Sequence, residues 1–423
     1  MKFSECGLKP EILRALEDIG YRDLTPIQEE TFPHILKGRD LLAMAETGSG
    51  KTGACAVPIV QASDPDVDGI QALILVPTRE LAQQYVSEIS SIARHTKLAP
   101  FCVYGGFSMD VQKAKLKHGV DILVATPGRL IDLLYKTDLA LNKVQTFVLD
   151  EADEMMDMGF IEDVKFIKDC LIHEHQTLMF SATMPSEIES LARESLNDPV
   201  KIHLNKDKVT PSSVEHRFQM IPSSKRFSAL CEFLDAEKPK QAIIFCNTRI
   251  GADKLERPLK QRYSGAEIIH GGFEQGKRTS IIERFRRQKI QLLVATDLAG
   301  RGLDFTHVTH IINYELSRAP ENYTHRTGRA GRMGRKGIAY TMMTSMDLRG
   351  WNKLMAQSRV KPIWTGKIPD ICKTGSTKPR SDDSSGNSTG EKRPSRSFNR
   401  RKPNRNRRPN SGSFSRKSST QSS

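Results

Sequence analysis

Short runs of apolar residues recur through the first half of the chain, separated by longer stretches with the spacing of amphipathic helices. The runs occupy positions 41–45, 71–78, 121–127, 146–149 and 177–183. They are rich in Val, Ile, Leu, Ala and Phe, which is typical of strands buried on both faces of a sheet. Most end in small or polar residues before the next helical stretch. Repeated strand–helix units of this kind predict a parallel sheet whose loops gather on one edge.

The same alternation begins again in the second half of the chain, after the segment NKDKVTPSS at 205–213, which has no apolar periodicity and is typical of a linker. The later runs occupy positions 241–248, 266–272, 291–297, 310–315 and 337–344. At the start of the chain, residues 8–19 and the stretch from Thr25-Pro26 onward have helical spacing. The predicted fold class is therefore α/β, with two tandem parallel-sheet domains that are flanked by helices.

The expected domain boundaries follow from these patterns: a first domain at 1–204, a linker at 205–213, a second domain at 214–366, and a disordered basic tail at 367–423. The tail is rich in Ser, Arg, Asn, Lys and Pro and has almost no apolar residues, so it cannot bury enough surface to fold. From position 373 onward it holds 14 Lys and Arg against 3 Asp and Glu. Such a charge favours a polyanion, most often nucleic acid.

Cysteine usage and apolar content predict a soluble, cytoplasmic chain. The seven cysteines are scattered, odd in number and without a CxxC pair, which argues against disulfides and a structural zinc site. The N-terminal residues lack the apolar core of a signal peptide, and no run of about 18 apolar residues exists. We therefore expect no membrane association.

Three carboxylates, Asp150, Glu151 and Asp153, follow directly after the strand predicted at 146–149. In open α/β sheets the ligand crevice lies beyond the carboxyl ends of the strands, so this position indicates a cation site, a base, or both. Acidic residues are also favoured at a helix N-terminus by the helix dipole. Taken alone, the pattern leaves both interpretations open.

A glycine-rich segment, AETGSGKT at 45–52, stands between a predicted strand and a predicted helix. This order is that of a phosphate-binding loop, in which backbone N–H groups surround phosphate oxygens. Lys51 would reach the β- and γ-phosphates, and Thr52 would hold Mg²⁺. Ala45 stands where the generic motif has glycine, and a flexible Gly/Ser loop is the alternative.

A phosphate-binding loop changes the interpretation of the carboxylates. Asp150 then occupies the position of an acid that holds Mg²⁺ through water, and Glu151 is placed to orient and deprotonate an attacking water. Capping becomes the minority interpretation.

The second half has no phosphate loop, but it contains the arginine-rich stretch YTHRTGRAGRMGRKG at 323–337. A basic run is usually a solvated face or a nucleic-acid patch. Here glycines separate Arg326, Arg329 and Arg332, so the backbone can approach an anion while the guanidinium groups point at it, as arginine fingers do.

Together these stretches resemble the DEAD-box family of ATP-dependent RNA helicases over roughly residues 1–350, and in particular bacterial members with a short basic C-terminal tail. Order and spacing carry the resemblance. The matching stretches are Phe3 with GYRDLTPIQ (20–28), AETGSGKT (45–52), PTRELA (77–82), TPGR (126–129), DEAD (150–153), SAT (181–183), IIFCNTR (243–249), QGKR (275–278), ATDLAGRGLD (295–304) and HRTGRAGR (325–332).

The resemblance implies tandem RecA-like domains, ATP and Mg²⁺ as cofactors, and a defined ATP site. In that site Gln28 reads the adenine edge, Phe3 packs near the ring and Asp304 holds the ribose. The implied catalytic residues are Lys51, Asp150, Glu151, Arg329 and Arg332. The implied ATP-binding residues are Phe3, Gln28, Thr47, Gly48, Ser49, Gly50, Lys51, Thr52 and Asp304, and the implied metal ligands are Thr52 and Asp150.

The resemblance also implies groups that couple ATP to RNA and groups that bind RNA. The coupling residues are Asp153, Ser181, Thr183, Arg301, His325 and Arg326. The RNA-binding residues are Arg79, Gly106, Thr126, Arg129, Thr248, Arg278 and Thr296. Thr248 and Thr296 have the alternative of simply ending strands, and His325 that of capping or packing.

The expected activity is RNA-dependent ATP hydrolysis coupled to local, non-processive unwinding or remodelling of RNA duplexes or ribonucleoproteins. Two alternatives remain: an ATP-gated RNA clamp or chaperone with little unwinding, and a DNA-directed helicase of the same superfamily. The expected partners are RNA and, beyond it, ribosomal or RNA-decay ribonucleoproteins, and the chain is expected to act as a monomer.

Overall fold

The computed structural model describes residues 1–45, 48–204, 214–297, 307–331, 336–358 and 360–366. Within these residues the chain forms two seven-stranded sheets, both in one compact unit, Met1–Lys373. The predicted linker at 205–213 and the predicted tail at 367–423 lie outside the described residues.

The first sheet has the strand order β3-β4-β2-β5-β6-β1-β7 and is parallel throughout. Its strands are β1 (Leu41–Met44), β2 (Ala72–Leu75), β3 (Pro100–Val103), β4 (Ile122–Ala125), β5 (Thr146–Leu149), β6 (Gln176–Ser181) and β7 (Val200–His203). The register pairs Leu41 with Leu178 across β1 and β6, and Leu149 with Met179 across β5 and β6. Since β5, β6 and β1 are neighbours, the loops that follow them meet at one edge.

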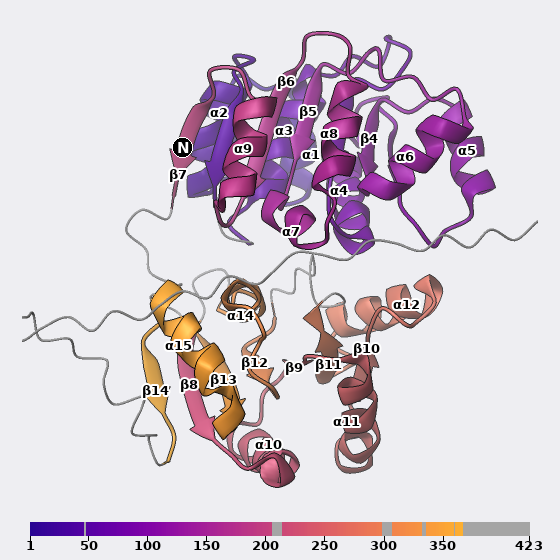
Figure 1. Ribbon diagram of the computed structural model, residues 1–423. Coiled ribbons are helices and arrows are strands. Elements are labelled where there is room, and N and C mark those ends of the chain that lie inside the picture. The colour runs from indigo at the N-terminus through magenta and orange to yellow at the C-terminus, as the bar shows by residue number, and fades with distance from the viewer. Residues whose placement is uncertain (46–47, 205–213, 298–306, 332–335, 359, 367–423) are drawn as a thin grey trace, which may run out of the picture. The chain divides into compact units, whose positions relative to one another are not determined.

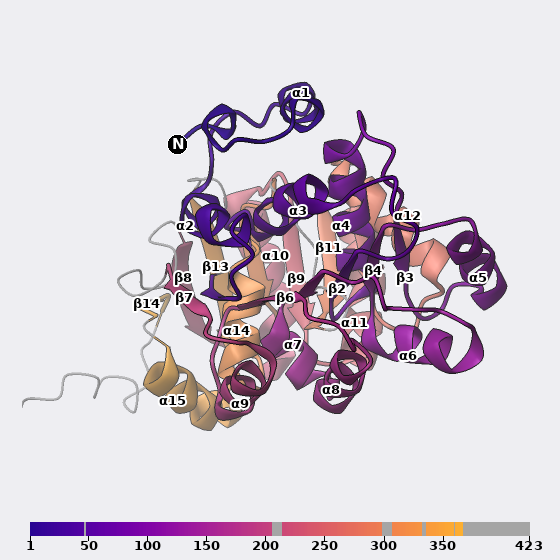
Figure 2. The ribbon, with the colours of Figure 1, turned by 90° about the horizontal axis from the view of Figure 1, so that it is seen from above.

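Helices cover both faces of this sheet (Figures 1 and 2). Alternate strand residues enter two separate cores, because successive side chains of a strand point to opposite faces: Leu41 and Ala43 join one, and Leu42 joins the other. The first core lies under α1 (Pro10–Asp18), α2 (Pro26–Ile35), α3 (Lys51–Ala62) and α4 (Arg79–Ile92). The second lies under α6 (Pro127–Lys136), α7 (Ala152–Asp157), α8 (Ile161–Asp169) and α9 (Ser186–Ser195), with α5 (Met109–Lys117) at its margin. A short 3₁₀ helix, η1 (Phe3–Glu5), precedes α1.

The second sheet repeats this design with the order β10-β11-β9-β12-β13-β8-β14, again parallel. Its strands are β8 (Val214–Met220), β9 (Ala242–Cys246), β10 (Ala266–Ile269), β11 (Leu292–Thr296), β12 (His310–Asn313), β13 (Gly337–Met343) and β14 (Pro362–Trp364). The accompanying helices are η2 (Ser223–Lys225), α10 (Arg226–Glu237), α11 (Arg249–Arg262), α12 (Gln275–Arg286), α14 (Pro320–Thr327), η3 (Ser345–Asp347) and α15 (Leu348–Gln357). Successive strand residues again pack on opposite faces of the sheet: Ile244 lies in one core and Ile243 in another.

The predicted α/β class is confirmed, and each apolar run named above coincides with an observed strand to within one residue at its start. Four further strands, β3, β7, β8 and β14, were not predicted. Three of them stand at sheet edges, where one side of the strand is uncovered and a continuous apolar run is not required. Strand β3 starts at Pro100, an edge position that tolerates the missing N–H. In the part of the chain that the structure describes, no helix is long and apolar enough to cross a bilayer.

Candidate active site

The loop between β1 and α3 has the backbone geometry of a phosphate cradle. Gly48 and Gly50 have φ angles of 86° and 98°, which favour glycine. Gly50 is also closely enclosed, because a Cβ there would lie 2.6 Å from Oγ1 of Thr25. Helix α3 begins at Lys51, so its first backbone N–H groups have no partner within the helix and are available to an anion. Ser49 and Thr52 are half-buried beside them.

Lys51 is buried at the start of α3. Its Nζ donates to the Ala45 carbonyl oxygen at 3.1 Å and lies 3.7 Å from Oδ1 of Asp150. Ala45, which departs from the generic motif, therefore binds Lys51 through its backbone carbonyl, a group that any residue supplies. The loop after β1 and the acid after β5 thus meet across the intervening strand β6.

Asp150 is held at the end of β5 by bonds to both of its carboxylate oxygens. Oδ1 accepts the backbone N–H of Glu151 at 2.8 Å, and Oδ2 accepts the hydroxyl of Tyr85 at 2.6 Å. A carboxylate offers about four lone-pair sites, so acceptor capacity remains for a cation or its waters.

Glu151 adopts the left-handed conformation, with φ 53° and ψ 50°, immediately before α7. For a residue other than glycine this costs about 1–3 kcal/mol, a strain that is concentrated at functional sites. Its Oε2 is buried and has no hydrogen-bond partner among the described residues. Burial raises the pKa of Glu151, while the charges of Arg329 and Lys51 oppose that rise. The side chain is placed to accept a proton from a group that the ligand brings.

The oxygen atoms at the start of α3 and the end of β5 fit Mg²⁺. Asp150 and Thr52 supply oxygen atoms, and Mg²⁺ is usually bound through one or two protein oxygens, with water and substrate phosphates completing its shell. The described residues contain no group of three or more His, Cys, Asp or Glu side chains able to hold a metal by themselves. With Asp150 and Thr52 as protein ligands, water and the phosphates of a nucleotide would supply the remaining oxygens.

A histidine from the second sheet's helix α14 contacts the acidic helix α7. The Nε2 of His325 lies 3.8 Å from Oδ2 of Asp153, and its Nδ1 contacts Oε1 of Glu154. Burial alone would lower the pKa of His325, but hydrogen bonds and charge attraction from Asp153 and Glu154 raise it to about 10. The pKa of Asp153 is lowered because the bonds to His325 and Thr183 outweigh the effect of its burial.

Asp153 also links α7 to the end of β6. Its Oδ2 accepts both the backbone N–H and the hydroxyl of Thr183, each at 2.9 Å, and the Ser181 hydroxyl donates to the Thr183 carbonyl at 2.7 Å. Asp153, Ser181, Thr183 and His325 therefore form one connected group, as the expected coupling role requires.

Arg329 follows α14 and is buried. Its Nε donates to the His325 carbonyl at 3.2 Å, and its charge acts on Glu151. The expected finger therefore lies near enough to the expected base to influence its charge state.

Arg326 has different surroundings. It is a large, fully buried side chain whose guanidinium binds both oxygens of Asp297, the side chains of Asn247 and Asn313, and the Glu315 carbonyl. These partners follow or end the neighbouring strands β11, β9 and β12, so its hydrogen bonds organise the loop edge of the second sheet. None of these bonds reaches the acid cluster, that is, the carboxylates of Asp150, Glu151 and Asp153.

The segment TPIQ (25–28) is hydrogen-bonded to the phosphate loop. Gln28 accepts the Thr25 backbone N–H at 2.9 Å and donates to the Gly50 carbonyl at 3.2 Å. Phe3 is buried, stacked on Tyr21 with ring centroids 6.1 Å apart and in edge contact with Phe32. The exposed ring of this pair is that of Tyr21, which the sequence interpretation did not single out.

A hollow of about 410 Å³ gathers residues expected to bind RNA from both sheets. Arg79, Thr126 and Arg129 line it from the first sheet, and Arg278 lines it from α12 of the second. Arg278 pairs there with Glu80, its Nη2 lying 2.6 Å from Oε1. Four of the seven expected RNA-binding residues thus share one hollow.

The other three expected RNA-binding residues lie elsewhere. Gly106, with φ +80°, is packed under Arg79, because a Cβ there would lie 2.4 Å from the arginine Nη1. Thr248 caps α11 by accepting the Gly251 N–H at 3.0 Å, and Thr296 is buried at the end of β11. The strand-ending role that the sequence left open is therefore present for Thr296, whereas Thr248 lies beyond the end of β9 and caps a helix instead.

Four expected site residues lie outside the described residues: Thr47, Arg301, Asp304 and Arg332. Three residues that contribute to the site geometry were missed by sequence reasoning, namely Tyr85, Glu154 and Glu80. Glu80 stands inside PTRELA and Glu154 directly follows DEAD, so their closeness to motifs in the sequence could have marked them as site residues. Tyr85 had none, since it occupies a core position of an amphipathic helix.

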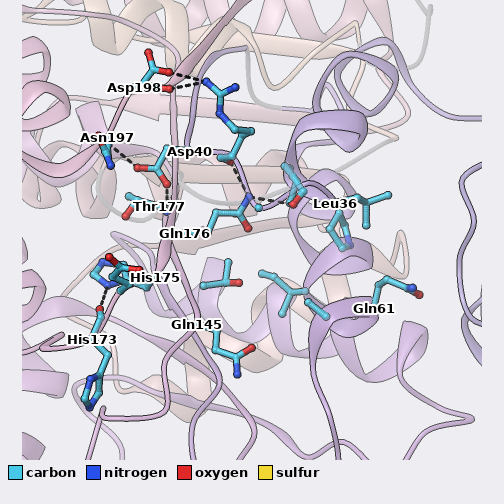
Figure 3. Close-up of a pocket in the computed structure, with 18 of the residues that line it drawn as sticks. Leu36, Asp40, Gln61, Gln145, His173, His175, Gln176, Thr177, Asn197 and Asp198 are labelled. Carbon is cyan, nitrogen blue, oxygen red and sulfur yellow. Dashed lines mark hydrogen bonds and ion pairs between the residues drawn. The ribbon is translucent and has the colours of Figure 1, made fainter.

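A larger hollow of about 1240 Å³ lies at the other end of the first sheet, beside the starts of β1, β5 and β6 (Figure 3). None of the expected site residues lines it. Its carboxylate, Asp40, is already engaged by the backbone N–H groups of Thr177 and Asn197 at 2.7 Å, and Asp198 pairs with Arg39. These bonds tie strand starts to neighbouring loops, which is a structural role.

Comparison with known proteins agrees with this geometry. Residues 25–191 match the DEAD/DEAH box helicase family, and residues 225–334 match the helicase conserved C-terminal domain. The chain is 41% identical over 342 residues to the DEAD-box ATP-dependent RNA helicase CshA of Bacillus cereus, covering 81% of this chain and 65% of that protein. The chain thus spans somewhat less than two thirds of that relative. It is 40% identical over 365 residues to ATP-dependent RNA helicase CshA of Listeria monocytogenes, covering 86% of this chain and 70% of that one.

Solved structures show the same architecture. S. cerevisiae Dbp5 bound to RNA and ADP BeF3 superposes with a TM-score of 0.79 at 27% identity, covering 86% of this chain and 95% of that chain. Mss116p bound to ssRNA and AMP-PNP gives a TM-score of 0.78 at 28% identity, covering 87% and 80%. Because both family matches and a relative at 40% identity cover most of its length, this chain belongs to the DEAD-box helicase family.

Proposed function

We propose that this chain is an ATP-dependent RNA helicase that couples ATP hydrolysis to local, non-processive unwinding or remodelling of RNA duplexes or ribonucleoproteins. The observation that carries the proposal is that a helix of the second sheet contacts α7, which follows the acid beside the phosphate loop. Lys51 lies 3.7 Å from Asp150, and the helix that carries His325 contacts Asp153 and Glu154. A phosphate-binding enzyme that acted with one sheet would not need charged groups from a second.

The relatives support this interpretation of the geometry. The CshA proteins are named as ATP-dependent RNA helicases, and the Dbp5 and Mss116p structures hold RNA together with a nucleotide analogue. We further propose that residues 1–204 and 214–366 are the two RecA-like domains, that the protein acts as a monomer, and that its substrates include ribosomal or RNA-decay ribonucleoproteins.

In this proposal the first sheet binds ATP. The N–H groups at the start of α3 and the Lys51 ammonium hold the phosphates, while Gln28 reads the adenine edge. Asp150 and Thr52 would hold Mg²⁺, which neutralises phosphate charge when bound. Glu151, buried with a free oxygen, orients the attacking water and accepts its proton. Arg329, joined by Arg332, stabilises charge that develops on the transferred phosphoryl group.

RNA is proposed to bind in the hollow lined by Arg79, Arg129 and Arg278. Since that hollow draws residues from both sheets, RNA bound there favours the arrangement in which α14 meets α7. ATP and RNA then each strengthen the binding of the other, as linkage requires. Arginine side chains that contact phosphate oxygens carry little sequence information, so broad RNA specificity is expected.

The direct test is ATP hydrolysis by the full chain with RNA and with DNA of equal sequence. RNA should stimulate turnover and DNA should not; equal stimulation by DNA would favour the DNA-directed alternative. Strand displacement on a short duplex, compared with ATP-dependent retention of single-stranded RNA, separates unwinding from clamping. Retention without displacement would contradict the unwinding activity.

A further inference from the structure

A tyrosine that no motif includes is bonded to the expected metal-binding carboxylate. Tyr85 lies on the buried face of α4, and its side chain is fully buried, as is that of Asp150. The Tyr85 hydroxyl lies 2.6 Å from Oδ2 of Asp150 and 3.8 Å from Sγ of Cys55. The hydroxyl has one proton, and the carboxylate is the stronger acceptor, so the proton is donated to Asp150.

This bond determines how the carboxylate is presented. Oδ2 faces the tyrosine, whereas Oδ1 faces the phosphate loop, 3.7 Å from Nζ of Lys51. Without the hydroxyl, Oδ2 would remain buried beside an apolar ring, and no other hydrogen bond of the described residues reaches that oxygen. The Asp150 side chain would then be held only through Oδ1, by the Glu151 N–H, and its orientation toward the loop would be less well fixed.

The helix that carries Tyr85 begins at the hollow assigned to RNA. Arg79, the first residue of α4, lines that hollow, and Glu80 pairs there with Arg278. Tyr85 lies six residues farther along, about 9 Å at the rise of an α-helix. Between and beyond them Leu81, Ala82 and Ile89 are buried in the core, so α4 is anchored along its length.

We propose that Tyr85 is a positioning residue: its hydroxyl holds Asp150 in the orientation that accepts Mg²⁺ and links this carboxylate to the RNA-facing start of α4. The inference rests on the proposed function and names a second route by which RNA acts on the ATP site, separate from the contact between His325 and the acid cluster. By this route, a displacement of Arg79 would reach the oxygen atoms of Asp150 through helix α4 and one hydrogen bond.

The test is Tyr85→Phe in the full chain, which removes one oxygen atom. Binding of a fluorescent ATP analogue is titrated with MgCl₂, and ATP hydrolysis is measured with and without RNA. The Mg²⁺ concentration at half-maximal binding should rise roughly tenfold, the effect of losing one hydrogen bond to a charged group. The ratio of RNA-stimulated to basal turnover should fall, while nucleotide binding in EDTA should not change.

Tyr340→Phe is the matched control. It removes a buried phenolic oxygen that is bonded to Gln219 in the second sheet, and it should leave the Mg²⁺ requirement unchanged. Adding Tyr85→Phe to Asp150→Asn should have little further effect, because the two residues act through one bond. An unchanged Mg²⁺ requirement in Tyr85→Phe would overturn the positioning role, and an unchanged stimulation ratio would overturn the link to RNA. If Asp150→Asn itself left the Mg²⁺ requirement unaltered, the metal assignment of the proposed function would fail instead.

Discussion

Glu151 combines two costly features, a left-handed backbone and a buried carboxylate oxygen that has no partner in the described part of the chain. Either would be selected against if the residue only capped α7, since Asp, Asn or Ser in an ordinary conformation caps a helix without strain. The arrangement is explained if the oxygen meets a water that arrives with the nucleotide.

Replacing Glu151 by Gln should therefore abolish turnover while sparing binding. The amide keeps the shape but cannot accept a proton, so we expect the rate of ATP hydrolysis to fall about 10²- to 10⁴-fold. Affinity for ATP and for RNA should remain, as measured by fluorescent-ligand titration. Glu162→Gln on α8, an exposed glutamate, is the control. Full ATPase activity in Glu151→Gln would remove this residue from the role of base.

His325 makes the contact between α14 and α7 dependent on pH. Its pKa is about 10 in that contact, against about 6.5 for a free imidazole. A group whose pKa is raised stabilises the contact fully below its free value, and that stabilisation is lost as pH rises toward 10. Between these values the contact takes up one proton, so its equilibrium constant falls up to about tenfold per pH unit.

RNA affinity in the presence of a non-hydrolysable ATP analogue should consequently weaken between pH 7.5 and 9.5. His325→Gln should bind less tightly at pH 7.5 and show a flatter pH dependence. The groups that face this histidine are the carboxylates of Asp153 and Glu154 and the nearby Arg329, which stays charged throughout. The same slope in wild type and variant would show that another group carries the effect.

The elements of the fold were largely predictable, because strands buried on both faces must be apolar throughout. Three of the four edge strands were missed, since the outer side of an edge strand imposes no such requirement. One of them, Val200–His203, alternates apolar and polar residues. The chemical groups needed at the site were predictable from the sequence, but the contacts that each side chain makes were not. Phe3 and Arg326 illustrate this: both are buried among aromatic or polar partners that the sequence does not indicate, and their roles in ATP binding and coupling stay predictions.

The phosphate loop depends on glycine at one particular position. At Gly50 a methyl group would meet Thr25 Oγ1 at 2.6 Å, whereas at Gly38, also at positive φ, it would meet nothing within 4 Å. Gly38→Ala should therefore lose only about 1–2 kcal/mol of stability from its backbone conformation. Gly50→Ala should carry a similar backbone cost and in addition reduce ATP affinity at least roughly tenfold.

Thermal unfolding and fluorescent-ATP titration distinguish the two glycine variants. An ATP affinity that is unchanged in Gly50→Ala would mean that Thr25 and Gln28 do not constrain the loop.

At the scale of the whole molecule, charge is divided between a nearly balanced body and a basic end. Positions 1–372 hold 50 basic and 47 acidic residues, and the remaining positions hold 14 and 3. The site that hydrolyses ATP is expected to lie entirely within the body. The basic end is expected to add affinity for phosphate without sequence readout.

Removing residues 373–423 should therefore spare RNA-stimulated ATP hydrolysis and weaken RNA binding most at low salt. The slope of log affinity against log salt should become shallower by about 0.7 for each phosphate of a single strand that the tail neutralises. A tail of shuffled sequence and equal charge should restore the slope. An unchanged slope after truncation would show that the tail does not bind phosphate.

The sequence by itself determined the fold class, the phosphate loop and the kinds of chemical group at the site, because burial and phosphate binding impose local patterns on residue type. Only the tertiary structure decided which groups meet. It joined His325 to Asp153 and Glu154, tied Tyr85 to Asp150, and paired Arg278 with Glu80 across about 200 positions of chain. Such contacts depend on strand order and on which helix face is buried, and these are properties of the packed molecule that no short stretch of sequence records.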